Sequence, residues 1–86
     1  MIQNVYSIYD VKAKEYGPLF LAKNDDIAVR MIKTNLKDIL YPQDYELYQV
    51  GCFDNESGEL IYASLDLVSD LSSIFMPKSS DEESKS

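Results

Sequence analysis

Histidine and tryptophan are absent from the 86-residue sequence, and cysteine occurs once, at Cys52. Without histidine, neither the common zinc sites nor the histidine-centred catalytic triads can be built. A single cysteine cannot form a disulfide within the chain. These absences exclude most of the familiar catalytic and structural-metal arrangements.

Long apolar runs are absent as well. No stretch approaches the roughly 18 consecutive apolar residues that a membrane-spanning helix needs. The first residues lack the basic start and apolar run of a signal peptide. We therefore expect a soluble protein that neither crosses a membrane nor is secreted.

Positive charge is scarce and unevenly placed. The chain has eight Lys and Arg residues against fifteen Asp and Glu residues, a net charge of −7. Residues 1–37 hold six basic and four acidic residues, net +2, whereas residues 38–86 hold two basic and eleven acidic residues, net −9. The overall sign disfavours a protein that coats DNA by neutralising phosphates. The asymmetry allows a basic contact surface in the first half, while the second half would repel DNA or engage a basic partner.

The first half contains one predicted strand and one predicted helix. Residues 2–9 are rich in β-branched and aromatic types that alternate loosely, which predicts a strand. An exposed loop is expected over residues 10–18, followed by a short extended segment at 19–22. Asn24 and the acidic residues after it are typical of a helix start, and the apolar spacing that follows predicts an amphipathic helix of about four turns ending near Leu40.

The second half begins with a predicted hairpin. Residues 45–53 and 59–63 alternate with period two, and Gly58 suits the left-handed position that closes such a loop. The apolar spacing of residues 64–75 predicts a second, shorter helix. Residues 77–86 contain no apolar side chain, so we expect a disordered tail there.

These elements predict a single α+β domain over residues 1–76. Its core would be a small antiparallel sheet of three or four strands, packed on one face by the long helix. A short C-terminal helix and the disordered acidic tail at residues 77–86 complete the prediction. The chain has room for one domain and no more.

No constellation of residues indicates catalysis, a metal or a cofactor. The acidic residues around the helix start lack the spacing and glycine of a calcium loop, so we interpret them as helix caps and solvated charges. Carboxylate pairs such as Asp54 and Glu56 have no sequence feature that places them in a pocket. Cys52, in a predicted strand, is most simply a packing residue. We expect a protein that is not an enzyme.

The basic residues of the first half form the most informative pattern. Arg30, Lys33 and Lys37 recur at i, i+3 and i+7, which places them along one side of the predicted helix. With the aromatic residues Tyr9, Tyr16 and Phe20, they could combine phosphate contacts with base stacking, as in proteins that bind single strands. The alternative is a solvated face with an ion pair between residues 26 and 30. The candidate nucleic-acid or partner residues are Lys12, Lys14, Lys23, Arg30, Lys33, Lys37 and Tyr16.

An apolar stripe on the second predicted helix is the other candidate surface. If it finds no room on the small core, it stays exposed and favours a partner or a second copy of the chain. The candidate oligomer or partner residues are Leu67, Leu71, Ile74 and Phe75. The tyrosines Tyr41, Tyr45 and Tyr48 could form a further interaction patch, although the alternation suggests that some belong to the core.

Residues 4–60 resemble the small nonstructural proteins of the gokushoviruses, single-stranded DNA phages of the Microviridae. The residues that carry the resemblance are the run Tyr6 to Asp10, the turn Gly17 to Phe20, the helix residues Asn24, Ala28 and Arg30, and the hairpin Asp44 to Tyr48, Gly51, Phe53, Asp54 and Gly58. These pieces, in this order, form a fairly specific combination, although none is specific alone.

The resemblance implies a non-enzymatic phage protein that regulates viral DNA replication in the host bacterial cytoplasm. Such proteins are compared with the factor that switches replication from double-stranded intermediates to single-stranded genomes for packaging. The implied partners are single-stranded DNA, the phage replication initiator, host replication proteins or the procapsid. The alternative from the residues alone is a protein interaction adaptor or homo-oligomeric module with no DNA contact.

Overall fold

A computed structural model describes residues 1–75, and the predicted tail at residues 77–86 lies outside this part of the chain. The described residues form one antiparallel sheet of five strands with the order β2-β1-β4-β5. β3 pairs with the same edge of β1 as β2 does, because β4 occupies the other edge. In chain order the elements are β1 (Ile2–Asp10), β2 (Glu15–Tyr16), β3 (Phe20–Ala22), α1 (Asp25–Asn35), the 3-10 turn η1 (Pro42–Asp44), β4 (Tyr45–Asp54), β5 (Glu59–Asp70) and α2 (Leu71–Phe75).

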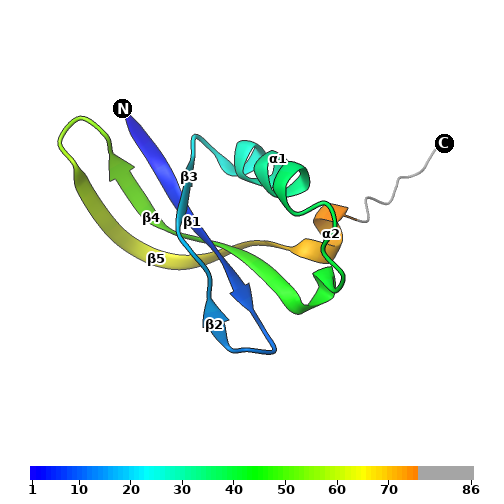
Figure 1. Ribbon diagram of the computed structural model, residues 1–86. Coiled ribbons are helices and arrows are strands. Elements are labelled where there is room, and N and C mark those ends of the chain that lie inside the picture. Colours follow the sequence, from blue (N-terminus) through cyan, green and yellow to red (C-terminus); the bar gives the residue numbers. More distant parts are fainter. Residues whose placement is uncertain (76–86) are drawn as a thin grey trace.

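The predicted α+β fold, with a sheet packed by one long helix, is wrong. The described chain is mostly sheet, and its two helices have 11 and 5 residues. Figure 1 shows a strongly curled sheet, with α1 over one face and β5 curving along its outer side. Two errors account for the difference: the extent of the first helix and the structure assigned to residues 64–70.

α1 begins where it was predicted and ends earlier. The Asn24 side chain accepts a hydrogen bond from the Ile27 N–H at 2.9 Å, which caps the first turn as expected. The helix stops at Asn35 instead of continuing to Leu40. Thr34 and Asn35 are weak helix formers, and Asp38 would place a negative charge at the negative end of the helix dipole. These local preferences explain a helix of about three turns.

Residues 64–70 belong to β5 and not to a second long helix. Ser64, Leu65, Asp66 and Leu67 alternate polar and apolar types, so the same residues also fit a strand. Pairing with β4 decides between the two patterns, and helix α2 begins only after residue 70. The Asp70 carboxylate accepts a hydrogen bond from the Ser73 N–H at 2.7 Å, so the helix is capped at Asp70, six residues beyond its predicted start at residue 64.

The predicted hairpin is confirmed. Asp54 pairs with Glu59, and Gly58 has φ of +79°, the left-handed conformation expected of it. Gly51 lies close to the backbone of β5, because a Cβ there would lie 2.1 Å from the Ile61 carbonyl oxygen. The β4–β5 register is irregular on either side of Tyr48 and Gln49, and these irregularities accompany the bend of the sheet.

The core lies between α1, α2 and one face of the sheet. Tyr6 from β1 and Leu47 from β4 are fully buried there. The Tyr6 ring stacks on Phe20, with 5.6 Å between ring centroids. The buried core residues are Tyr6, Ala22, Ala28, Ile32, Leu47, Leu71 and Ile74. Within residues 1–75 no helix is long and apolar enough to cross a membrane.

Candidate functional site

Three tyrosine rings meet on the sheet, one each from β1, β2 and β4. Tyr9 and Tyr16 are cross-strand partners whose ring centroids lie 4.6 Å apart. The Tyr48 ring meets both edge-on, at 6.3 Å from Tyr9 and 5.8 Å from Tyr16. Tyr16 is 43% exposed, and the other two are half-buried. We call Tyr9, Tyr16 and Tyr48 the tyrosine cluster; it presents aromatic surface to solvent.

Two lysines lie in the turn beside this cluster. The turn joins β1 to β2 and is held by the Asp10 carboxylate, which accepts hydrogen bonds from the backbone N–H groups of Lys12 and Ala13, both at 3.0 Å. Lys14 closes the turn with φ of +60°, and its N–H donates to the Asp10 carbonyl at 2.7 Å. The side chains of Lys12 and Lys14 are exposed and make no ion pair with residues 1–75. Two cations therefore project from the end of the hairpin that carries Tyr9 and Tyr16.

The hydroxyl of Tyr48 is neutral at ordinary pH. It donates a hydrogen bond to the Glu46 carboxylate at 3.1 Å, and this bond, together with burial, raises the pKa of Tyr48. A neutral phenol offers a ring for stacking and a hydrogen-bonding hydroxyl, but no activated nucleophile. The Tyr48 side chain therefore suits binding by stacking and hydrogen bonding.

The remaining basic candidates do not form one stripe with the turn lysines. Arg30 and Lys33 are exposed on α1, whereas Lys37 lies beyond its end and Lys23 precedes its cap. The alternative ion pair of Arg30 with Asp26 is not formed, since the ion pairs of residues 1–75 all involve the N-terminal amino group. The structure thus offers two separate basic regions: the β1–β2 turn and α1 with its flanking residues.

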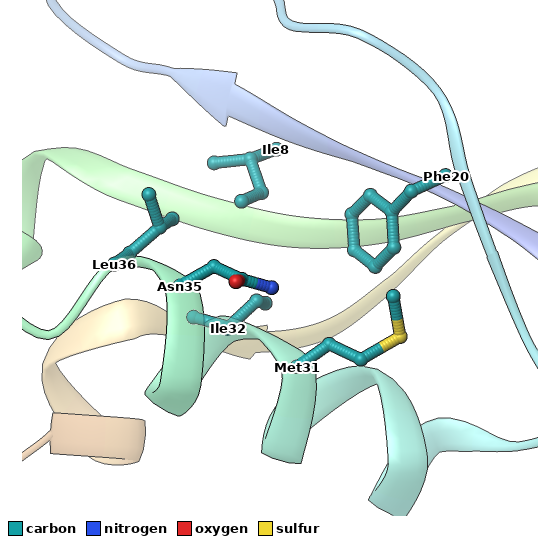
Figure 2. Close-up of a pocket in the computed structure, with 6 residues that line it drawn as sticks. All are labelled: Ile8, Phe20, Met31, Ile32, Asn35 and Leu36. Atoms are coloured by element: carbon teal, nitrogen blue, oxygen red, sulfur yellow. The ribbon is translucent and has the colours of Figure 1, made fainter.

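An apolar cavity of about 220 Å³ lies between α1 and the sheet, and Figure 2 shows its lining. Asn35 is the one polar residue among the six that line it: Ile8, Phe20, Met31, Ile32, Asn35 and Leu36. A second hollow of about 390 Å³ shares three of these residues and extends past the helix end toward Lys37 and Tyr45. The lining of the first cavity suits an apolar group, and it supplies no acid, base or nucleophile. No group of three or more Cys, Asp or Glu residues in the described chain could hold a metal ion.

The predicted apolar stripe does not exist as one exposed surface. Leu71 and Ile74 are core residues, 0% and 5% exposed, and Phe75 packs against that core. Leu67 is 58% exposed, but it belongs to β5. The small core does have room for α2, because the short first helix leaves part of the sheet face uncovered.

The sequence does not predict the tyrosine cluster as a unit. It predicts Tyr16 as a binding residue with Tyr9 as an aromatic neighbour, and it places Tyr48 in a different patch. Phe20, which the sequence predicts as another aromatic neighbour of the basic residues, instead stacks on Tyr6 on the core side. Asp10 could have indicated that Tyr9 pairs with Tyr16. Asp is common at the start of a turn, and a turn at residues 11–14 places the residues on either side of it opposite one another.

Comparison with known proteins agrees with the resemblance seen in the sequence. The family model described as "Phage ORF5 protein" matches residues 3–81. The chain is 37% identical over 62 residues to Protein ORF5 of Chlamydia phage 1, a gokushovirus, and the match covers 62% of this chain and 65% of that protein. The chain thus spans slightly less than two thirds of this relative. No solved structure matches significantly. By its match over nearly its whole length, the chain belongs to the phage ORF5 protein family.

Proposed function

We propose that this protein is a non-enzymatic phage accessory factor that binds single-stranded DNA during replication of the viral genome. The observation that carries the proposal is the tyrosine cluster beside Lys12 and Lys14, two cations that make no ion pair within residues 1–75. Membership of the phage ORF5 family supports a role in the phage life cycle. The apolar lining of the first cavity supports a binding protein over an enzyme.

Stacking would supply most of the affinity. A base on an aromatic side chain contributes about 1–3 kcal/mol, and any base serves because each has a π-face. Two lysine–phosphate contacts predict a slope of about −1.4 in a plot of log affinity against log salt. A fourfold rise in salt should therefore weaken binding by about sevenfold. The net charge of −7 keeps the affinity moderate and penalises the more densely charged duplex.

Fluorescence anisotropy with a labelled oligothymidine and a labelled duplex, at low and at physiological salt, tests the proposal. The double variant Lys12→Glu and Lys14→Glu should weaken single-strand binding at low salt and lose most of the salt dependence of binding. The double variant Arg30→Glu and Lys33→Glu changes the net charge by the same amount on α1 and is the matched control. Tyr16→Leu should weaken binding at both salt concentrations, because stacking is screened little.

Three outcomes would contradict the proposal in different ways. Equal losses from the two charge reversals would show that only net charge matters. A loss confined to the α1 variant would move the contact surface to the helix. No binding at either salt concentration, by a folded sample, would favour the second candidate, a protein interaction module without DNA contact. The apolar cavity beside α1 is the observation that favours this second candidate, with the phage replication initiator or host replication proteins as its partners.

A further inference from the structure

β5 is a long strand with a free edge. It spans 12 residues, Glu59–Asp70, and within residues 1–75 only β4 pairs with it. Edge strands of natural proteins are commonly protected by lysine or proline, and β5 contains neither. Figure 1 shows β5 as the outermost strand, with β4 on one side and no element along the other. Within residues 1–75 no strand pairs with the backbone groups on that side, and the Glu59 N–H donates to the Ser57 hydroxyl at 3.2 Å.

The hairpin end of β5 is the part best suited to pairing. The pairing with β4 is regular from the pair of Asp54 and Glu59 to the pair of Gly51 and Tyr62, and it becomes irregular beyond Tyr62. The side chains of this run are apolar and exposed: Leu60 is 59% exposed, Ile61 44% and Tyr62 72%. An added strand would cover these side chains on both faces of the sheet, because successive residues of a strand point to opposite faces.

Acidic side chains dominate the charge around this edge. Residues 38–77 contain no Lys or Arg at all. Glu59 and Asp66, both exposed on β5, make no ion pair with the described chain. Among residues 1–75, the cation that pairs with carboxylates beside this edge is the N-terminal amino group, which lies 3.1 Å from Glu56 and 3.8 Å from Asp54. A strand added along β5 would meet Glu59 and Asp66, which that amino group does not pair with.

We propose that the Glu59–Tyr62 edge of β5 binds an extended, basic segment of a partner protein by adding it as a further strand. Backbone hydrogen bonds would provide affinity, and alternating apolar and basic residues would match the exposed apolar side chains and the surrounding carboxylates. Charge argues against a second copy of this chain, because two such edges would bring carboxylates together with no Lys or Arg of residues 38–77 to offset them. This proposal does not depend on DNA binding by the tyrosine cluster.

The probe is a fluorescein-labelled octapeptide of alternating lysine and valine, titrated with the full chain and followed by anisotropy. The matched peptide carries N-methyl groups on alternate backbone amides, which keeps the charge and removes one set of strand hydrogen bonds. The expected result is saturable binding of the first peptide, at least tenfold weaker binding of the second, and shifts of the Glu59–Tyr62 amide signals in a nitrogen–proton correlation spectrum.

Two double variants with the same change in charge test the electrostatic part. Glu59→Gln with Asp66→Asn should weaken peptide binding by about three- to tenfold, since each exposed pair contributes only a small free energy. Asp26→Asn with Asp38→Asn, on and beyond α1, should change it by less than about twofold, because salt screens distant charges. Circular dichroism should show unchanged folding for both.

Each contrary result overturns the proposal. Equal affinity for the two peptides would show charge attraction without strand pairing. Equal weakening by the two double variants would show that the site is not at β5. Concentration-dependent dimers in light scattering, with β5 amide shifts and no peptide binding, would identify a second copy as the occupant. Absence of both binding and shifts would show that the edge is not a docking site.

Discussion

Gly51→Ala is the sharpest test of the contact between β4 and β5. An added Cβ would lie 2.1 Å from the Ile61 carbonyl oxygen, 3.2 Å from its carbon and 3.3 Å from the Tyr62 Cα. An ordinary contact of this kind is about 3.4 Å, so the two strands must separate by about 1 Å. Because all three contacting atoms are backbone, no side-chain rotation can relieve the clash.

The expected cost lies toward the upper end of the 1–3 kcal/mol that is typical of overpacking, at about 3 kcal/mol. With a urea dependence of about 1 kcal/mol per molar for a small domain, the unfolding midpoint should fall by about 2–3 M. Urea unfolding, followed by far-ultraviolet circular dichroism and by tyrosine fluorescence, measures this directly.

Gly17→Ala is the matched control. A Cβ at residue 17 would lie 3.5 Å from the Ile8 carbonyl oxygen, an ordinary contact. That variant should therefore stay within about 1 kcal/mol of the parent, and reduced freedom of the unfolded chain makes it neutral or slightly stabilising. A Gly51→Ala midpoint within about 0.5 M of the parent would refute the described approach of the two strands.

Two further predictions concern residues outside this contact. Lys14→Gly should raise the free energy of unfolding by about 0.5–1 kcal/mol in a urea titration, because Lys14 has φ of +60° and glycine adopts this conformation freely; a loss of stability would count against that turn. Tyr6→Phe removes the hydrogen bonds from the Tyr6 hydroxyl to Asp25 at 2.7 Å and from Asn4 at 3.1 Å, at a cost of about 1–2 kcal/mol near neutral pH. Burial, assisted by Asp25, raises the pKa of Tyr6 from 10.0 to about 12, so the folded state keeps this proton at a higher pH than the unfolded state. The resulting stabilisation is complete below pH 10 and is lost as the pH rises to about 12. Between pH 10 and about pH 12, the free energy of unfolding of the parent should therefore fall by about 2–3 kcal/mol more than that of Tyr6→Phe, as measured by urea unfolding at each pH. Equal decreases for the two proteins would contradict the raised pKa of Tyr6.

Local signals in the sequence predicted the elements that local chemistry determines. The Asn24 cap fixes the start of α1, and Gly58 closes the hairpin in the left-handed conformation it was predicted to adopt. Strand β1 follows from its β-branched and aromatic composition. These features depend on residues within a few positions of one another.

Features that depend on distant pairing could not be predicted in the same way. Residues 64–70 fit both a helical stripe and strand alternation, and only pairing with β4 selects the strand. Leu71 and Ile74 become core residues because α1 is short enough to leave part of the sheet face to α2. The tyrosine cluster needs the β1–β4 register, which sets Tyr48 opposite Ser7, and no local pattern specifies that register.

The pairing of β1 with β4 also determines the order in which this chain can fold. Ile2 pairs with Asp54 and Asp10 with Tyr45, so the central ladder joins residues 35 to 52 positions apart. The chain must pay the entropy of closing this long loop before the pairing of β1 with β4 stabilises it. This requirement slows folding compared with a fold held by local contacts. Until residues 45–54 are available, β1 has only the local strands β2 and β3 as partners. During synthesis the edge of β1 that faces β4 therefore stays unpaired until more than half of the chain has been made.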